Sequence, residues 1–170
     1  MSVPELISLF EKPEDLWIYE GKNYVNPYRI LMDETGPLAW RVPQVKQAPW
    51  LNKYLVRWIV LRASREIIGS ISFHGGASEV GMIEIGLGID ARFRNQGYGM
   101  EALAGMWIWV CQQEGVKILR YTVSSANLAS VALIKKFGFK HVGQQLDEAD
   151  GPEEIYELSV EDFKKLTLYL

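Results

Sequence analysis

The amino-acid sequence predicts an α/β (α+β) fold, in which helices pack on a mixed β-sheet. Residues 82–89 alternate between apolar residues and a row that holds Glu84 and two glycines, which is the pattern of a half-buried strand. The two glycines leave a trough where a ligand can approach the backbone. Apolar residues at helical spacing follow in Leu103, Trp107 and Val110, and a second strand and helix come after them.

The predicted elements follow one another in a simple order. A short helix begins at Pro4, and the five prolines from Pro13 to Pro49 then favour loops and short elements. β-Branched and aromatic residues at 54–61 and 67–74 predict the two arms of a hairpin. The remaining elements are a strand at 82–89, a helix from about residue 98 to near Gly115, a strand at 118–123, a helix at 128–137 stopped by Gly138, and strands at 141–146 and 155–160 joined by a turn around Asp150 and Gly151.

Composition limits the classes of function. The 170 residues suffice for one domain with a buried core, and 48% of them are hydrophobic, as in a folded globular protein. The net charge of -3 leaves no broad basic surface, so we expect neither nucleic acid nor a membrane as a partner. The single cysteine, Cys111, excludes an intrachain disulfide, and two histidines offer no metal-ligand spacing. We therefore expect no metal and a cytoplasmic location, since no stretch resembles a membrane span or a signal peptide.

The stretch between the third strand and the next helix is the most informative part of the chain, and it runs Arg94-Asn95-Gln96-Gly97-Tyr98-Gly99. Its glycines let the backbone approach an anion, and the start of the helix adds N–H groups and a positive dipole end. This layout is typical of a phosphate-binding turn, and a solvated turn that ends in a helix cap is the alternative. A P-loop is excluded, because no Gly-Lys-Ser/Thr follows.

Three features stand together in one order along the chain: the strand Glu84–Ile89, the loop Arg94–Gly99, and Asn127-x-x-Ser130 leading to Lys136-Phe137-Gly138-Phe139. In this order they resemble the GNAT family of N-acetyltransferases, and most closely the branch with the ribosomal-protein alanine N-acetyltransferases. The resemblance covers roughly residues 55–160. It implies a single GNAT-like domain over residues 1–170, with a twisted, mainly antiparallel sheet. Residues 54–160 would form the acetyl-CoA-binding core, and residues 1–53 a variable acceptor side.

The resemblance also implies which residues hold the cosubstrate, acetyl-CoA. In the family, backbone groups of the strand before the loop pair with the pantetheine arm, loop amides hold the pyrophosphate, and the next helix adds two polar residues. The implied cofactor-binding residues are Leu87, Gly88, Ile89, Arg94, Asn95, Gln96, Gly97, Tyr98, Gly99, Asn127 and Ser130. An ordinary helix cap is the alternative for Asn127 and Ser130. For Arg94, and for Arg92 beside it, the alternative to a cofactor contact is a solvated surface charge.

Acetyl transfer needs a free amine, because an ammonium group must lose its proton before it attacks a thioester. Glu84 is the candidate general base, since it lies on the glycine-bearing face of the strand, and a structural carboxylate is the alternative. His74 is the second candidate base, with a capping or surface role as its alternative. Cys111 is interpreted as a packed thiol in the middle of a helix, not as an acyl carrier.

The sequence departs from the family at the general acid. Many members carry a Tyr in the last helix that protonates the departing thiolate, and here Ile134 occupies that position. A second acidic position, used by some members on the preceding strand, is Thr122. The general acid is therefore unassigned, and water or the acidity of the thiol itself, near pKa 8.5, is expected to suffice.

The sequence thus predicts an acetyl-CoA-dependent N-acetyltransferase that acts on a primary amine by direct attack in a ternary complex. A non-catalytic acyl-CoA-binding or sensing module is the alternative. We expect the acceptor to be a protein or peptide N-terminus or a small amine, because aromatic and acidic residues gather in the first half of the chain, although core packing is the alternative for most of the aromatic ones. These residues are Trp17, Tyr19, Tyr24, Tyr28, Trp40 and Trp50, with the acids Asp33, Glu34 and Glu79. The oligomeric state is open, with a homodimer among the alternatives.

Overall fold

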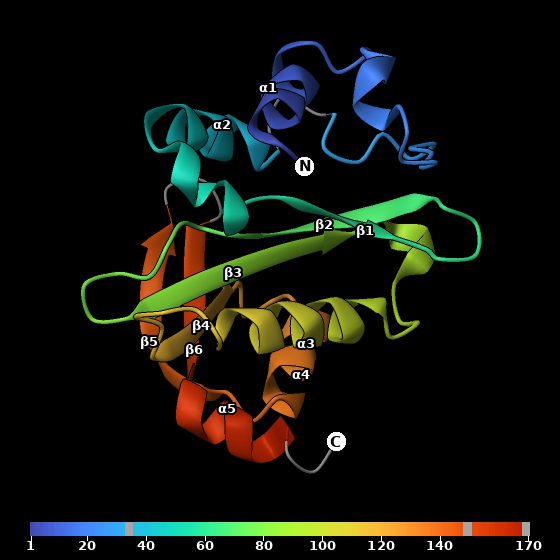
Figure 1. Ribbon diagram of the computed structural model, residues 1–170. Coiled ribbons are helices and arrows are strands. Elements are labelled where there is room, and N and C mark those ends of the chain that lie inside the picture. Colours follow the sequence, from blue (N-terminus) through green and yellow to red (C-terminus); the bar gives the residue numbers. More distant parts are fainter. Residues whose placement is uncertain (33–35, 148–150, 168–170) are drawn as a thin grey trace. The chain divides into compact units, whose positions relative to one another are not determined.

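The computed structural model describes residues 1–32, 36–147 and 151–167 (Figure 1). The chain forms two compact units, Met1–Gly75 with Leu87–Gly99, and Gly76–Gly86 with Met100–Leu170. β3 (Met82–Ile89) and α3 (Tyr98–Val110) each contribute residues to both units. The strands are hydrogen-bonded in the order β1-β2-β3-β4-β6-β5. The pairs β1–β2, β4–β6 and β5–β6 are antiparallel, and β3 pairs parallel with β4. The prediction of a mixed, mainly antiparallel sheet with helices is confirmed.

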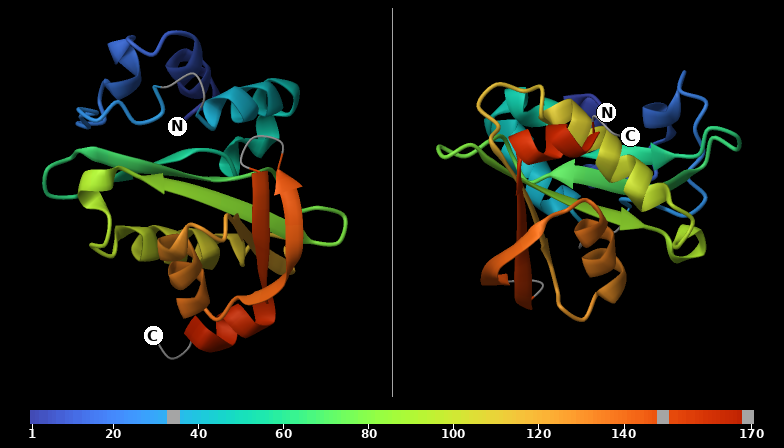
Figure 2. Two further views of the ribbon diagram at one scale, coloured as in Figure 1. Left: turned by 180° about the vertical axis from the view of Figure 1, so that it is seen from behind. Right: turned by 90° about the horizontal axis from the view of Figure 1, so that it is seen from below.

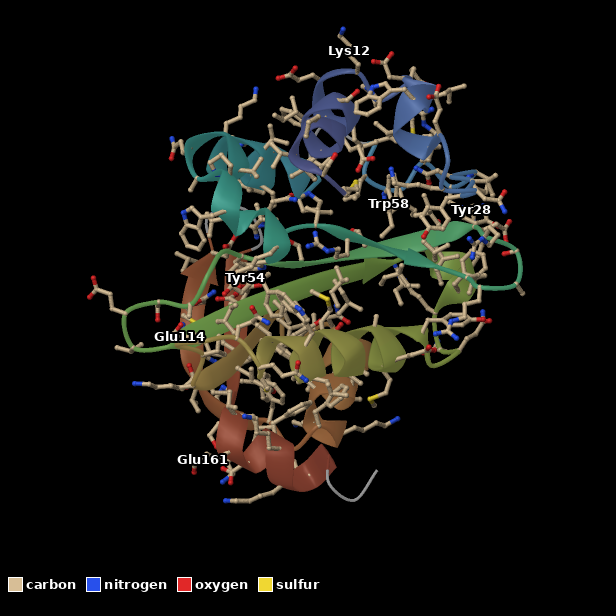
Figure 3. All side chains as sticks on the ribbon, viewed as in Figure 1. Lys12, Tyr28, Tyr54, Trp58, Glu114 and Glu161 are labelled. Atoms are coloured by element: carbon tan, nitrogen blue, oxygen red, sulfur yellow. The ribbon has the colours of Figure 1, made fainter. Side chains whose placement is uncertain are left out.

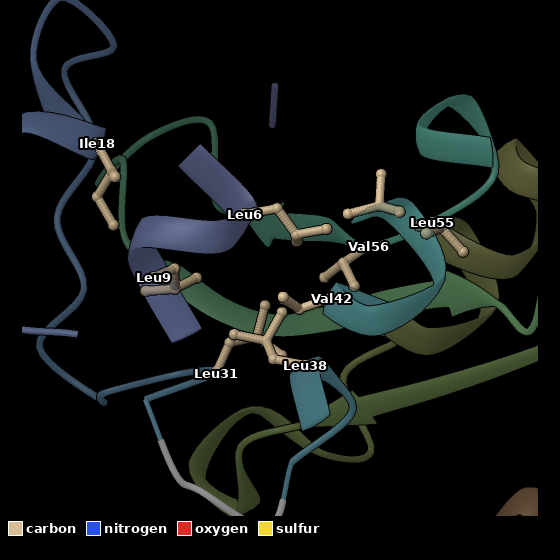
Figure 4. Packing of buried hydrophobic residues seen from close by; sticks show 9 residues of the cluster. Leu6, Leu9, Ile18, Leu31, Leu38, Val42, Leu55 and Val56 are labelled. Atoms are coloured by element: carbon tan, nitrogen blue, oxygen red, sulfur yellow. The ribbon is translucent and has the colours of Figure 1, made fainter. Parts of the chain in front are cut away.

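In the first unit, short helices cover a hairpin. The hairpin is formed by β1 (Arg57–Val60) and β2 (Ile67–Phe73), which pair antiparallel. The first helix, α1 (Val3–Glu11), begins at a capping box in which Ser2 and Glu5 accept hydrogen bonds from each other's backbone N–H. Between Met1 and Gly75 this unit also contains the 3₁₀ turns η1 (Leu16–Tyr19) and η2 (Pro49–Lys53) and the helix α2 (Leu38–Gln47). Their core, seen in Figure 4, consists of Leu6, Leu9, Ile18, Leu31, Leu38, Val42, Val45, Leu55 and Val56.

The helix α2 was not expected, because the prolines of this region favoured loops and short elements. Pro43 lies inside the helix, where its missing N–H and its ring cost about 3 kcal/mol. The buried face of α2 consists of Leu38, Val42 and Val45, each worth about 1.5–3 kcal/mol when fully buried. Tertiary burial therefore outweighs the local effect of the proline.

In the second unit, β4 (Ile118–Val123) pairs parallel with Met82–Glu84 of β3 and antiparallel with β6 (Gly151–Ser159). The strand β5 (Lys140–Asp147) pairs antiparallel with β6, and the two lie side by side in Figures 1 and 2. The helix α4 (Leu128–Lys136) ends before Gly138, whose φ of 79° suits glycine.

The ends of several elements differ from the prediction. β1 begins at residue 57 and not at 54, α3 ends at Val110 and not near Gly115, and β6 begins at Gly151 and not at residue 155. The last helix, α5 (Val160–Thr167), was missed, because its two buried residues, Val160 and Phe163, are too few to show a helical period. The expected turn residue Asp150 lies outside the described residues. Within the described ranges, no helix has both the length and the apolar character needed to cross a bilayer.

Candidate cofactor and catalytic site

Two glycines bring β2 close to the end of β3 in the first unit. A Cβ atom at Gly69 would collide with the carbonyl oxygen of Gly88 and would lie 3.1 Å from the Cα of Ile89. The N–H of Asp90 donates to the carbonyl of Ile68 at 2.9 Å. A Cβ atom at Gly88 would meet nothing within 4 Å, and this residue is exposed. The side of β3 on which Gly88 lacks a side chain is therefore open.

The loop that follows has the backbone of a tight turn. Asn95 and Gly97 adopt positive φ angles of 59° and 89°, and residues 94–97 are all exposed. The Arg94 Nε donates to the carbonyl of Ile89 at 2.9 Å, and the Gln96 Nε2 donates to the carbonyl of Arg92 at 3.0 Å. Because α3 begins directly after Gly97, its first-turn N–H groups, which have no intrahelical partners, adjoin the loop. This arrangement suits a phosphate group.

A 3₁₀ turn, η3 (Ala91–Phe93), leads into this loop. Arg92 donates from Nε and Nη2 to the Asp90 carboxylate at 2.7 and 2.9 Å, and its backbone N–H donates to the same group at 3.0 Å. These hydrogen bonds to Arg92 lower the pKa of Asp90 to about 2. Arg92 is therefore held in an ion pair at the surface, where its side chain is 60% exposed.

Glu84 lies half-buried on β3, within the second unit. Its Oε1 accepts a hydrogen bond from the Thr122 hydroxyl at 2.6 Å. Arg120 stands opposite Glu84 in the parallel register, so Thr122, two residues further along β4, shares its face of the sheet. Arg120 itself donates to Glu157 at 2.8 and 2.6 Å. The sequence analysis considered Thr122 only as the residue at a position where some family members have an acid. It did not predict the hydrogen bond to Glu84, because the alternation of β4 does not show which residue lies beside it on the next strand.

The start of α4 holds the other two polar residues of the predicted site. The Asn127 side chain accepts a hydrogen bond from the Ser130 N–H at 3.2 Å, so Asn127 is the helix cap. Burial raises the pKa of the Tyr121 phenol, and the Ser130 side chain near it acts in the opposite direction. Asn127 is exposed, whereas Ile134, further along α4, is fully buried. Both roles of Asn127, cap and cofactor contact, are compatible, because a capping amide keeps its N–H donors.

The two remaining candidates occupy different surroundings. His74 is exposed at the end of β2, and its carbonyl accepts a hydrogen bond from Gln44 at 3.0 Å. Cys111 is buried, and this burial raises the pKa of its thiol. A buried thiol with a raised pKa is a poor nucleophile, which agrees with a packing role. In the part of the chain that the structure describes, no three His, Cys, Asp or Glu side chains gather as a metal site would require.

The aromatic residues of the first half divide into two groups. Tyr19 stacks on Trp58 with ring centroids 5.3 Å apart, and Tyr24 meets the same ring edge-on at 6.5 Å; Trp58 is labelled in Figure 3. Trp40 and Trp50 are 59% and 66% exposed and contribute little to the core. Among the expected acids, Glu79 is exposed, whereas Asp33 and Glu34 lie outside the described residues.

Comparison with known proteins gives consistent matches. A family model described as "Acetyltransferase (GNAT) domain" matches residues 4–140. The curated "Uncharacterized N-acetyltransferase YjdG" of Bacillus subtilis is 34% identical over 83 residues, which are 48% of this chain and 49% of that protein. The chain therefore spans about half the length of this curated relative.

Solved structures share the fold. An acetyltransferase (GNAT family) from Bacillus anthracis aligns with a TM-score of 0.56 at 20% identity, over 65% of this chain and 70% of that one. The spermidine N-acetyltransferase SpeG from Vibrio cholerae aligns with a TM-score of 0.61 at 13% identity, over 79% of this chain and 81% of that one. At such identities the likeness concerns the fold alone.

Proposed function

The chain belongs to the GNAT family of acetyltransferases, and we propose that it transfers the acetyl group of acetyl-CoA to a primary amine by direct attack in a ternary complex. The observation that carries the proposal is the continuous path from β3 through the loop 94–97 into α3. Positive φ at Asn95 and Gly97 and a helix start directly behind them suit a pyrophosphate. Leu87, Gly88 and Ile89 are assigned to the pantetheine arm, because the side of β3 at Gly88 is open.

Glu84 is assigned as the general base. The amine nitrogen forms a bond to the thioester carbon, the C–S bond breaks, and the proton of the amine passes to Glu84 directly or through one water. The Thr122 hydroxyl supports this role, because its hydrogen bond to Oε1 fixes the orientation of the carboxylate. Proximity and backbone N–H groups that stabilise the tetrahedral oxyanion supply the rest of the acceleration.

The departing thiolate has no assigned acid. Ile134 is apolar and buried at the position where many family members have a Tyr, and a thiol near pKa 8.5 is a tolerable leaving group without one. The apolar side chain of Ile134 also favours the second candidate function, an acyl-CoA-binding or sensing module without turnover. Asn127 and Ser130 stay predictions as cofactor contacts, and a cytoplasmic location stays a prediction too.

The acceptor is proposed to be a protein or peptide N-terminus, as in the ribosomal-protein branch, or a small amine. Release of free thiol from acetyl-CoA is measured with a panel that contains an alanine-terminated peptide, spermidine and a lysine-containing peptide. Turnover with any amine supports the enzyme. CoA binding without turnover across a wide panel supports the sensing module, and absence of CoA binding contradicts both.

The Glu84→Gln variant tests the base. It keeps the size of the side chain but cannot take the proton, so kcat should fall by about 10² to 10⁴ while the Kd of CoA stays the same. Thr122→Val should lower kcat by about tenfold or more, because one charge-assisted hydrogen bond is lost, and Thr122→Ser should restore it. Equal activity of wild type and Glu84→Gln would remove Glu84 from the mechanism.

A further inference from the structure

The turn that leads into the phosphate-binding loop is held by a residue from far earlier in the chain. The Arg92 guanidinium lies over the ring of Tyr28, with its central carbon 4.0 Å from the ring centroid. The same ring meets Phe93 edge-on, with centroids 5.1 Å apart. Tyr28, labelled in Figure 3, therefore contacts two of the three residues of η3. The loop begins at the next residue, Arg94.

Tyr28 is itself anchored at its other end. Its hydroxyl donates to Glu66 at 2.9 Å, and Glu66 also accepts a hydrogen bond from Ser64 at 2.7 Å. Nearby, Val25 bridges to the start of β2, because its N–H donates to Arg65 and its carbonyl accepts from Ile67. The phenol thus joins the turn between β1 and β2 to η3.

Arg92 has little freedom to act as a phosphate ligand. Two of its nitrogens donate to Asp90, and one face of its guanidinium is covered by Tyr28. A guanidinium that binds a carboxylate through two nitrogens and stacks on an aromatic ring is fixed in position. Fixing Arg92 also fixes the backbone that enters the loop, because Asp90 and Arg92 lie just before residues 94–97. The Arg92 carbonyl in addition accepts a hydrogen bond from the Gln96 side chain within the loop.

We infer that Tyr28 and Arg92 are positioning residues for the pyrophosphate of CoA: together they form a clamp that sets the backbone of residues 94–97. This inference rests on the proposed function. The clamp acts on the loop and not on the thioester, so its loss should raise the Kd of CoA and the KM of acetyl-CoA and leave kcat unchanged.

The experiment is a double-mutant cycle on the full chain, with CoA affinity measured by calorimetry. Tyr28→Leu and Arg92→Gln should each weaken CoA binding about three- to tenfold, and the double variant should be no weaker than either single one. Arg65→Gln is the matched control, because Arg65 lies over the ring of Tyr24 at 5.3 Å and does not contact η3; its CoA affinity should equal that of wild type. S-Acetylpantetheine, a donor without pyrophosphate, should be used equally well by all four variants.

The double variant distinguishes the clamp from direct phosphate binding by Arg92. Losses that multiply in that variant would show that Arg92 binds the phosphate by itself, and unchanged affinity in Tyr28→Leu would remove the clamp. Equal losses with S-acetylpantetheine would indicate general damage to the fold and would also overturn the clamp.

Two further results keep the inference testable. If Tyr28→Leu does not fold, CoA affinity is measured for Arg92→Lys instead. Lysine keeps the positive charge but cannot make the planar contacts of the guanidinium, so wild-type CoA affinity in this variant would overturn the clamp. Wild-type protein that binds no CoA would contradict the proposed function as well, whereas a failed clamp with normal wild-type binding contradicts this inference alone.

Discussion

A pair of neighbouring glycines offers the sharpest test of the proposed site, because Gly69 is needed for packing and Gly88 is proposed to leave space for the ligand. In Gly69→Ala the new Cβ would lie far inside the contact distance of the Gly88 carbonyl oxygen, so β2 and the end of β3 must separate by about 1 Å. Overpacking of this kind costs about 1–3 kcal/mol. For a chain of this length the expected fall in Tm is on the order of 5 °C, measured by calorimetry or circular dichroism.

The second variant, Gly88→Ala, should behave in the opposite way. Its Cβ meets nothing within 4 Å, so the Tm should stay within about 2 °C of wild type. If the pantetheine arm lies against β3 at this residue, the added methyl group occupies its space, and the Kd of CoA should rise about tenfold. Unchanged CoA affinity in a folded Gly88→Ala protein would refute the assignment of Leu87–Ile89, and an unchanged Tm in Gly69→Ala would refute the packing argument.

Three further predictions concern the loop, the thiol and the ion pair. Gly97→Val places a β-branched residue at a φ of 89°, so calorimetry should show CoA binding at least about tenfold weaker, or about 1.4 kcal/mol; equal affinity would contradict the loop assignment. Burial raises the pKa of the Cys111 thiol, so wild type should show no burst of thiol release and Cys111→Ala should retain wild-type turnover. A burst in wild type that disappears in Cys111→Ala would indicate an acyl-enzyme. The pKa of Asp90 is lowered from the ordinary value of 3.8 to about 2. The ionised carboxylate therefore stabilises the folded protein above pH 3.8, and this stabilisation is lost as the pH falls toward 2. The difference in Tm between wild type and Asp90→Asn should therefore be constant from about pH 5 to 8 and shrink from about pH 4 to 2, and a difference that varies near neutral pH would contradict the assignment.

Local patterns were sufficient for the elements that carry the proposed site. The strand at 82–89, the strand at 118–123 and the helix that begins at Leu128 were placed correctly, because alternation, apolar spacing and capping residues are properties of neighbouring positions. The turn before α3 was also recognised locally, since Gly97 has a positive φ of 89°, and its role in phosphate binding stays a prediction. Local rules failed at α2, where burial of one helix face outweighed Pro43.

The sequence by itself therefore determined which residues are candidates, and the tertiary structure decided which of them touch. Glu84 meets Thr122 across 38 residues of sequence, and neither strand's alternation specifies which residues stand side by side. The contacts of Tyr28 with Arg92 and of Gly69 with Gly88 arise in the same way, from chain segments that meet only after folding. Periodicity assigns a residue to a face, but register and side-chain direction assign its partner, and these depend on how the whole core packs.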